Sequence, residues 1–389
     1  DLFDVVVERV EQADLGEAAG EVHEDKAHVV AAGGQPDRGS SAAAAQVHHR
    51  PVRRRRQQVG VFGQPGRRLP EHGVRVPGDE SAGGSGGPVG RGGGDMKAGL
   101  ASNLFAMDAL AACGLAPAAD VFYQSVVEEE CTGNGALACL ARGYKADAAL
   151  IPEPFSEKLV TAQLGVLWFQ VHLKGLPTHV AYAGNGANAI EAAFPLIHAL
   201  HEMEHRWNAA ENRPNDFAHM DHALNLNIGK IEGGDWTSSV PAWSVFDVRM
   251  AIFPGQSIDA AKAEIEQVIL DAARENAFLR NSLPEIVYHG FHAEGYALSQ
   301  DSSAKAASAI SALDQAHLSA TGETLDRAAI TATTDARFFG LYADTPALVY
   351  GPHAEAIHGF NERVDLESLR RVTKATALFI ADWCGVETI

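Results

Sequence analysis

The sequence predicts an α/β protein: a mainly parallel sheet flanked by helices, with a small α+β domain inserted. First, short apolar strand candidates alternate with helices over residues 96–151 and the pattern resumes after residue 330. This order is typical of a parallel sheet covered by helices. Second, three strand-like segments between residues 165 and 285 accompany only two amphipathic helices. Third, the composition changes near residue 88, before which neither pattern is present.

The first α/β part begins with an Ala/Leu-rich helix over residues 96–113, which Gly114 closes. Residues 121–127 and 146–151 are short apolar runs that we expect to be buried strands, with a helix between them. After the insert, a strand over residues 347–350 precedes a closing helix that ends at Trp383. Asp365 is a good N-cap for that helix.

The insert differs because its strands follow one another. Residues 166–173, 224–231 and 244–252 are strand-like. A helix over residues 189–207 has one apolar stripe, formed by Ile190, Phe194, Ile197 and Leu200. A second helix over residues 258–275 repeats that spacing with Ile258, Ala261, Ile265, Ile269 and Ala272. We therefore expect catalytic-type α/β structure in residues 89–164 and 286–389, and a lid or dimerisation domain in residues 165–285.

Residues 1–88 are atypical. They contain the run Arg53–Arg56 and a Gly/Ser-rich stretch at residues 81–87, and their apolar residues follow neither a helical nor a strand period. One interpretation is a disordered basic and glycine-rich tail. The other is that this segment is not the native sequence of the fold, for example a frame-disrupted stretch of a GC-rich gene.

Charge and cysteine content bound the function. The formal charge of -19 argues against nucleic acid or an anionic membrane as partner. Four cysteines without a C-x-x-C pair fit a reducing compartment. No apolar run approaches the ~18 residues of a transmembrane helix, and the first residues lack the basic-then-apolar order of a signal peptide. We expect a cytoplasmic protein.

Four clusters of polar residues follow strands or open a helix. They are the glycine-rich turn Gly90–Gly94 with Asp95, the triplet Glu128–Glu130, Glu153 between two prolines, and Gly351-Pro352 followed by His358. Each is weak alone, and the triplet in particular is compatible with a surface loop. Together they place carboxylates and a histidine at carboxyl ends of strands, where α/β folds bind ligands. Such donors suit zinc, with cobalt or manganese as substitutes.

Seven motifs in order carry a family resemblance. They are G-R-G-x-x-D-M-K-x-G, E-E-E-x-x-G-x-G, D-x-x-x-x-x-E-P, G-x-P-x-H, I-x-G-G, T-D-A-R, and Y-G-P with H-x-x-N-E. From about Gly90 to the C-terminus the chain resembles acetylornithine deacetylase, succinyl-diaminopimelate desuccinylase, aminoacylase and carboxypeptidase G, the co-catalytic zinc hydrolases of clan MH. The resemblance implies a zinc-exopeptidase-like fold, a two-metal site and a homodimer.

The resemblance also implies roles for individual residues. Asp95 would bridge two metal ions, Glu130 and His358 would complete one site, and Glu153 would serve the other. Glu129 would be the general base that takes a proton from water.

Two further residues match family positions outside the metal ligands. His179 matches a histidine that a partner subunit presents to stabilise the oxyanion, with an ordinary exposed histidine as the alternative. Arg249 matches a position associated with a substrate carboxylate, although a structural arginine fits the pattern nearly as well.

One family motif, a strand ending in H-x-D some thirty residues before the bridging Asp, is missing. Residues 60–66 contain no histidine, His23-Glu24-Asp25 follows no apolar strand, and His72 has no Asp two residues on. The second metal therefore has only Asp95 and Glu153 as written.

Three functions stay open on this sequence. The first is a metal-dependent hydrolase that removes an acyl group from the nitrogen of an amino acid or related amine. The second is a catalytically impaired family member that acts as a non-enzymatic dimer. The third is a dipeptidase or carboxypeptidase with the same chemistry. The segment Gly233 to Pro241 favours the deacylase branch, although Ser239 replaces the usual Asn before Val-Pro.

Overall fold

The computed structural model describes residues 90–389, and residues 28–31 for their backbone alone. Contacts divide the chain into Asp1–Gly34 with Gly86–Ile389 as one unit and Gln35–Ser85 as another. Every described residue belongs to the first unit. A short strand over residues 28–31 corrects the expectation that this segment has no strand. The other expectations for residues 1–88, including those for His23 and His72, lie outside the described residues.

The larger described sheet has seven strands. Its order is β10 (Tyr296–Ala297), β5 (Leu159–Gln163), β12 (Ala347–Val349), β4 (Ala149–Ile151), β1 (His28–Ala31) and β3 (Val121–Gln124), with β11 (Arg327–Ile330) also paired to β5. The α/β class is confirmed, but strand directions correct the expected mainly parallel sheet. Only β12 with β4 and β11 with β5 are parallel among its described pairs. β10 enters from the neighbouring sheet without a helical crossover, so it can run antiparallel to β5.

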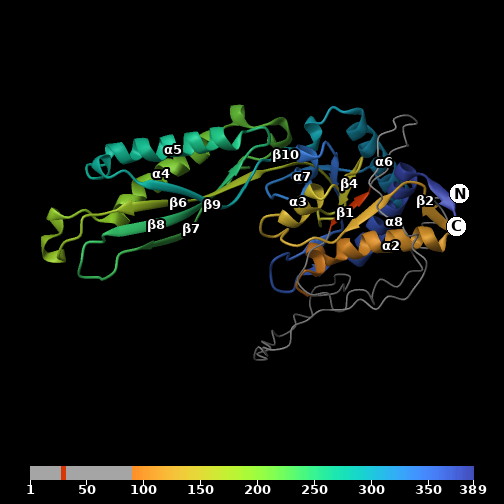
Figure 1. The fold of residues 1–389 in the computed structure, drawn as a ribbon, viewed down its shortest axis with the longest axis horizontal. Helices are drawn as coiled ribbons and strands as arrows, with labels where there is room; N and C mark the ends of the chain where they lie inside the picture. The colour runs from red at the N-terminus through yellow and green to blue at the C-terminus, as the bar shows by residue number, and fades with distance from the viewer. Residues whose placement is uncertain (1–27, 32–89) are drawn as a thin grey trace, which may run out of the picture. The chain divides into compact units, whose positions relative to one another are not determined.

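Helices pack on this sheet in two groups (Figure 1). α8 (Leu366–Cys384) packs against α2 (Gly99–Ala112) and α6 (Ala304–Thr321), and most of its residues are buried. α7 (Ala336–Tyr342) packs against α3 (Asn134–Ala141) and contacts β4, β10 and β12. The Asp365 side chain accepts the Ser368 N–H at 2.6 Å, which confirms the predicted N-cap of α8.

The smaller described sheet has four antiparallel strands in the order β7 (Leu226–Gly233), β8 (Trp243–Ile252), β6 (Gly165–Lys174) and β9 (Glu285–Ala293). Figure 1 shows α4 (Ala189–Trp207) and α5 (Ile258–Glu275) lying side by side along it, and both helices contact its strands. The sheet extends to Ala293, beyond residue 285 at which we expected the insert to end. Its role as a lid or dimerisation domain stays a prediction.

Both long helices of this part begin and end as predicted, but one stripe is partly wrong. Ala261, Ile265 and Ile269 of α5 are buried as expected. In α4, however, Phe194 is 59% exposed. The buried face of α4 keeps Leu200 of the predicted stripe and otherwise consists of other apolar residues: Ala189, Ala192, Ala193, Leu196, Met203 and Trp207. The prediction counted only the large apolar residues, whereas three alanines also lie on the buried face.

Short elements complete the described chain. β2 (Leu115–Pro117) pairs with β15 (Val386–Thr388), and β13 (Ala354–Glu355) pairs with β14 (Arg363–Val364). Helical turns are η1 (Gly93–Ala98), η2 (Val180–Asn185), η3 (Ala210–Asn212), η4 (Asn215–Phe217), η5 (Leu279–Asn281) and η6 (Leu298–Gln300). No helix in the described ranges combines the length and apolarity needed to cross a bilayer.

Candidate metal centre

The glycine-rich turn before α2 holds Asp95 through an acidic side chain from the far end of the chain. The Glu362 carboxylate accepts the backbone N–H groups of Gly92 at 2.9 Å, Gly94 at 3.0 Å and Asp95 at 2.8 Å. Glu362 is buried, with 2% of its surface exposed. A carboxylate that accepts several backbone N–H groups is strongly fixed. The backbone N–H groups of this turn are therefore occupied by the protein's own carboxylate.

Glu130 stands on a tight turn after β3. Glu128 has a left-handed backbone with φ of 66°, and its carbonyl accepts the N–H groups of Thr132 at 2.9 Å and Gly133 at 2.7 Å. Gly133 has φ of +73°, and a Cβ built there would lie 2.2 Å from Asp335 Oδ1. Only glycine fits this position, because both the backbone angle and the close packing exclude a side chain.

Arg337 ties the same turn to the segment before α7. Its guanidinium donates to the carbonyls of Thr132 at 2.8 Å and Thr334 at 2.9 Å, and lies over the Phe338 ring. Burial lowers the pKa of Arg337, an effect that the nearby carboxylates of Asp335 and Glu129 oppose. Glu129 thus lies within electrostatic range of a buried cation.

His358 reaches the two carboxylates from the loop between β13 and β14. Its Nε2 lies 2.8 Å from Glu130 Oε1 and 3.1 Å from Asp95 Oδ2. One ligand atom of each of the three residues lies within 4.8 Å of the others. This is the one such group of His, Cys, Asp and Glu in the described part of the chain. The structure therefore brings together three of the four predicted metal ligands.

Glu153, the fourth predicted ligand, is not part of this group. It follows β4 and is 4% exposed. A Cβ on Gly351 would meet the Glu153 carbonyl oxygen at 2.3 Å, and one on Gly99 would meet the Pro152 carbonyl oxygen at 2.2 Å. The backbone around Glu153 thus packs between the start of α2 and the loop that leads to His358.

His179 and Arg249 lie in the part built on the four-stranded sheet. His179 is exposed and caps η2, where its Nδ1 accepts the Ala181 N–H at 3.1 Å. Arg249 lies on β8 opposite Trp168, and burial lowers its pKa. Neither belongs to the carboxylate–histidine group, and their roles stay predictions.

Sequence reasoning assigned no role to Glu362 or Arg337. Both stood inside quoted motifs, Glu362 in H-x-x-N-E and Arg337 in T-D-A-R. Their motif membership was the available signal, but the backbone groups that they bind are 267 and 205 residues away, so no spacing rule identifies them.

The donor set fits a divalent cation. Two carboxylates and one imidazole are a common ligand set for zinc and related ions. The Nε2–carboxylate distances are those of ion pairs, and a cation between the three groups would relieve the repulsion between Asp95 and Glu130. The α/β fold and this group together define a metallohydrolase.

Comparison with known proteins identifies the family. The chain belongs to the peptidase family M20/M25/M40, whose model matches residues 76–382. The N-formyl-4-amino-5-aminomethyl-2-methylpyrimidine deformylase of Halalkalibacterium halodurans is 29% identical over 309 residues, 76% of this chain and 71% of the relative. The deformylase of the same name from Bacillus subtilis is 28% identical over 312 residues, 76% of this chain and 72% of the relative.

Solved structures agree on the fold. An aminopeptidase PepT from Bacillus cereus superimposes with a TM-score of 0.57 at 19% identity, covering 74% of this chain and 70% of the other. An M20 family metallo-carboxypeptidase from Sulfolobus solfataricus gives 0.57 at 16% identity, covering 75% and 76%. The predicted family and zinc-exopeptidase-like fold are confirmed, and so is a metal-dependent amide hydrolase at the level of the family.

Proposed function

We propose that this chain removes a small acyl group from the nitrogen of an amine, by hydrolysis of an amide bond at the group formed by Asp95, Glu130 and His358. The observation that carries the proposal is the convergence of these three side chains, with ligand atoms within 4.8 Å of one another. They come from three different segments of the chain. Folding brings two carboxylates to one imidazole, an arrangement that suits a bound cation.

Zinc is the proposed metal, with cobalt or manganese as substitutes. Asp95, Glu130 and His358 would hold one ion, and Glu153 would serve a second ion that Asp95 bridges. A bound divalent ion supplies Lewis acidity, which polarises an amide carbonyl and makes water easier to deprotonate. The second position needs a further ligand, which the expected H-x-D motif would provide.

Glu129 is the proposed general base. It precedes the ligand Glu130, on the turn whose geometry Glu128, Gly133 and Arg337 fix. Its carboxylate would take one proton from water as the water oxygen bonds to the carbonyl carbon, and would give that proton to the amine nitrogen as the C–N bond breaks. The products are a carboxylic acid and a free amine.

An N-formyl amine is the first substrate to test. The relatives from Halalkalibacterium halodurans and Bacillus subtilis are named as deformylases of an N-formyl aminomethylpyrimidine. Arg249 is proposed to contact a carboxylate where the substrate carries one, because a guanidinium binds carboxylates with two hydrogen bonds. A peptide bond at the same site would give the carboxypeptidase or dipeptidase alternative.

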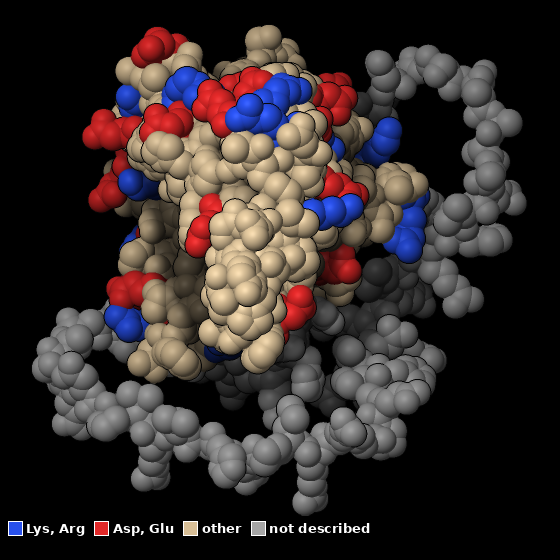
Figure 2. Space-filling model, turned by 90° about the vertical axis from the view of Figure 1, so that its left-hand side faces the viewer, with Lys and Arg blue, Asp and Glu red and all other residues tan. Residues whose placement is uncertain are grey.

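We further propose that the active form is a homodimer in which His179 of one chain serves the other. Large apolar side chains are exposed around His179 and along the adjoining helix and edge strand: Leu176, Val180, Tyr182, Phe194, Ile231 and Trp236. Figure 2 looks onto this end of the protein: charged side chains gather over the upper part of the view, while the protruding part in the lower centre carries few of them. An exposed apolar surface of this kind favours association.

The incomplete second metal position has a separate test in the coding DNA. If residues 1–88 result from a frame change, another frame upstream of Gly90 should encode an apolar strand ending in H-x-D. No such reading frame would leave the chain with one complete metal position, and would favour the non-enzymatic alternative.

Turnover of N-formyl, N-acetyl and N-succinyl amines with added zinc or cobalt tests the function. Glu129→Gln should lower kcat by about 10²- to 10⁴-fold and leave the bound metal unchanged. The neighbouring Glu128→Gln is the matched control and should keep most activity. Retained activity in Glu129→Gln would remove Glu129 from its role. Absence of turnover by the metal-loaded chain on every amide would contradict the hydrolase.

A further inference from the structure

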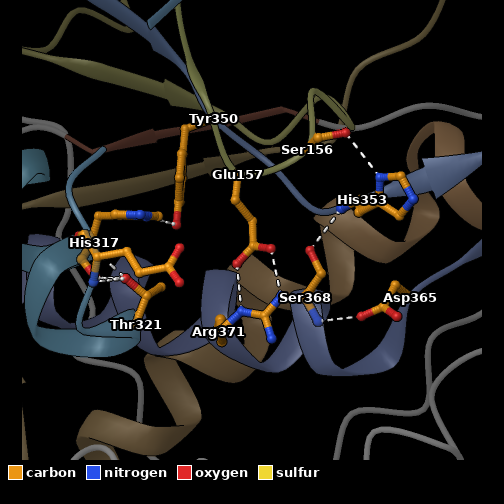
Figure 3. A network of polar contacts seen from close by, with 10 residues as sticks. Ser156, Glu157, His317, Thr321, Tyr350, His353, Asp365, Ser368 and Arg371 are labelled. Atoms are coloured by element: carbon orange, nitrogen blue, oxygen red, sulfur yellow. Dashed lines mark hydrogen bonds and ion pairs between the residues drawn. The ribbon is translucent and has the colours of Figure 1, made fainter. Parts of the chain in front are cut away.

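A polar cavity of about 360 Å³ lies in the part built on the seven-stranded sheet and includes no residue of the carboxylate–histidine group. Its walls come from the loop after β4, the C-terminal end of α6 with the turn that follows, and the first turns of α8. A volume of this size holds a small organic molecule. Figure 3 shows five of the residues that line it, Ser156, Glu157, His317, Thr321 and Arg371, together with polar partners behind them.

His317 is the most deeply placed polar group of the cavity wall. It is 5% exposed, and its Nδ1 lies 2.9 Å from the hydroxyl of fully buried Tyr350, as Figure 3 shows. Within the described part of the chain, this imidazole nitrogen is the one hydrogen-bond partner of the Tyr350 hydroxyl. A buried hydroxyl needs an acceptor for its proton, so Tyr350 donates and Nδ1 accepts.

The tautomer follows from that hydrogen bond. Because Nδ1 accepts, the proton of the neutral ring is on Nε2, and burial lowers the pKa of His317, which keeps the ring neutral. Nε2 has no hydrogen-bond partner in the described chain and is not among its fully enclosed polar atoms. The wall of the cavity therefore presents one N–H donor without an acceptor.

The charged groups around the cavity have both signs. Arg371 donates to both carboxylate oxygens of Glu157, at 2.8 and 2.7 Å, so these two residues largely neutralise one another (Figure 3). Lys158 adds a cation, while Glu323 and Asp326 add two carboxylates at the exposed edge. A simple anion would be repelled by the acidic edge, and a simple cation would leave the N–H donor unused.

We propose that this cavity is a second ligand site, for a small zwitterion of the size of a free amino acid. The ligand's carboxylate would accept from His317 Nε2 and lie near Lys158, and its ammonium group would face Glu323 and Asp326. The proposal goes beyond the hydrolase function and does not rest on it, because none of the residues involved belongs to the carboxylate–histidine group.

Calorimetric titration of the full chain tests the site. L-glutamine and L-valine are the zwitterionic probes, while acetate and methylamine carry one charge each. We expect saturable one-to-one binding of a zwitterion and weaker binding of both singly charged probes. The titration is performed with EDTA present and again with zinc, since amino acids also chelate metals. Binding that requires zinc would assign the ligand to the metal centre and overturn the proposal.

Two variants distinguish the role of the His317 N–H donor from that of the Tyr350 hydroxyl behind it. His317→Phe with Tyr350→Phe removes both partners of the buried hydrogen bond, so no polar group is orphaned, and should weaken binding by about tenfold or more. Tyr350→Phe alone keeps the His317 N–H and should bind within about threefold of the wild type. Circular dichroism checks that both fold. Equal binding by the double variant, or no saturable binding by the wild type, would overturn the proposal.

A third variant tests the charge preference. Glu323→Gln with Asp326→Asn removes the two exposed carboxylates, and should weaken binding of the zwitterions while it strengthens binding of acetate. Both residues are exposed, so this change should leave the fold intact. Acetate that binds to the wild type as tightly as L-glutamine would make the cavity a simple anion site and contradict the zwitterion.

Discussion

At the scale of single residues, Glu362 determines where Asp95 stands. Three backbone N–H groups of the glycine-rich turn donate to this one buried carboxylate, and the last of them is the N–H of Asp95 itself. A proposed metal ligand is thus positioned by a buried side chain that is not part of the carboxylate–histidine group. Residues of this kind, which orient ligands from behind, commonly contribute to metal affinity.

Replacing Glu362 should therefore weaken metal binding. Glu362→Ala leaves three N–H groups without their acceptor and frees the turn, so we expect the affinity for zinc to fall by about 10- to 100-fold. Glu362→Gln keeps one carbonyl oxygen and should lose less. Zinc affinity is measured by competition with a chromophoric chelator, with Glu355→Gln as an exposed control. Equal affinity in Glu362→Ala and the wild type would contradict the positioning role.

His317 should make the stability of the fold depend on pH. Burial, opposed by Glu157, Glu323 and Asp314, lowers its pKa below the ordinary 6.5, so the unfolded chain takes up this proton more readily than the folded one. Stability is then fully present above pH 6.5 and decreases as the pH falls below it. Urea unfolding between pH 7.5 and 5.5 measures this slope. The slope should be shallower in the double variant His317→Phe, Tyr350→Phe, and an unchanged slope would exclude His317 as its source.

At the scale of helices and strands, periodicity predicted the long elements well. The bounds of α4 and α5 were obtained directly, because 18 or more residues with a 3.6-residue apolar period leave few alternatives. α6 was not predicted, since its sequence is rich in alanine and serine and its apolar stripe is weak. The direction of the strands could not be predicted from the sequence either, because strands as short as β10, with two residues, and β12, with three, show no clear pattern.

The turn after β3 provides a test at this scale. Gly133→Ala adds a Cβ at a left-handed backbone position and against Asp335, so unfolding free energy should fall by about 3 kcal/mol, from strain and overpacking together. Gly114→Ala is the matched control, since its φ is also +73° but nothing lies within 4 Å of the added Cβ. The control should lose about 1 kcal/mol. Urea denaturation measures both, and equal losses would contradict the packing argument.

At the scale of the whole molecule, the site is assembled from segments that meet only in the folded chain. Motif order along the sequence was sufficient to predict that Asp95, Glu130 and His358 come together, because each stands in a motif of the family resemblance. The sequence could not place Glu153 relative to them, since its position depends on how Gly99 and Gly351 let neighbouring backbones approach. Outside β1, the interpretations of residues 1–88 as a disordered tail or a frame-disrupted segment stay predictions.

The proposed homodimer gives a prediction for the whole molecule. Tyr182→Glu with Trp236→Glu puts two charges into the exposed apolar surface near His179, so we expect a dimer to dissociate into monomers. Leu318→Glu, another exposed apolar residue but on α6, is the control and should not change the mass. Sedimentation velocity measures the state. A wild-type chain that sediments as a monomer at micromolar concentration would contradict the dimer.

Zinc binding to ligand variants tests the metal centre most directly. We expect the wild-type chain to bind at least one zinc ion. His358→Ala and Glu130→Gln should each lose at least about 100-fold in affinity, because each removes one of three ligands. Glu128→Gln, a change to the adjacent carboxylate outside the group, should bind zinc like the wild type. Wild-type affinity in His358→Ala and Glu130→Gln would contradict a metal held by Asp95, Glu130 and His358.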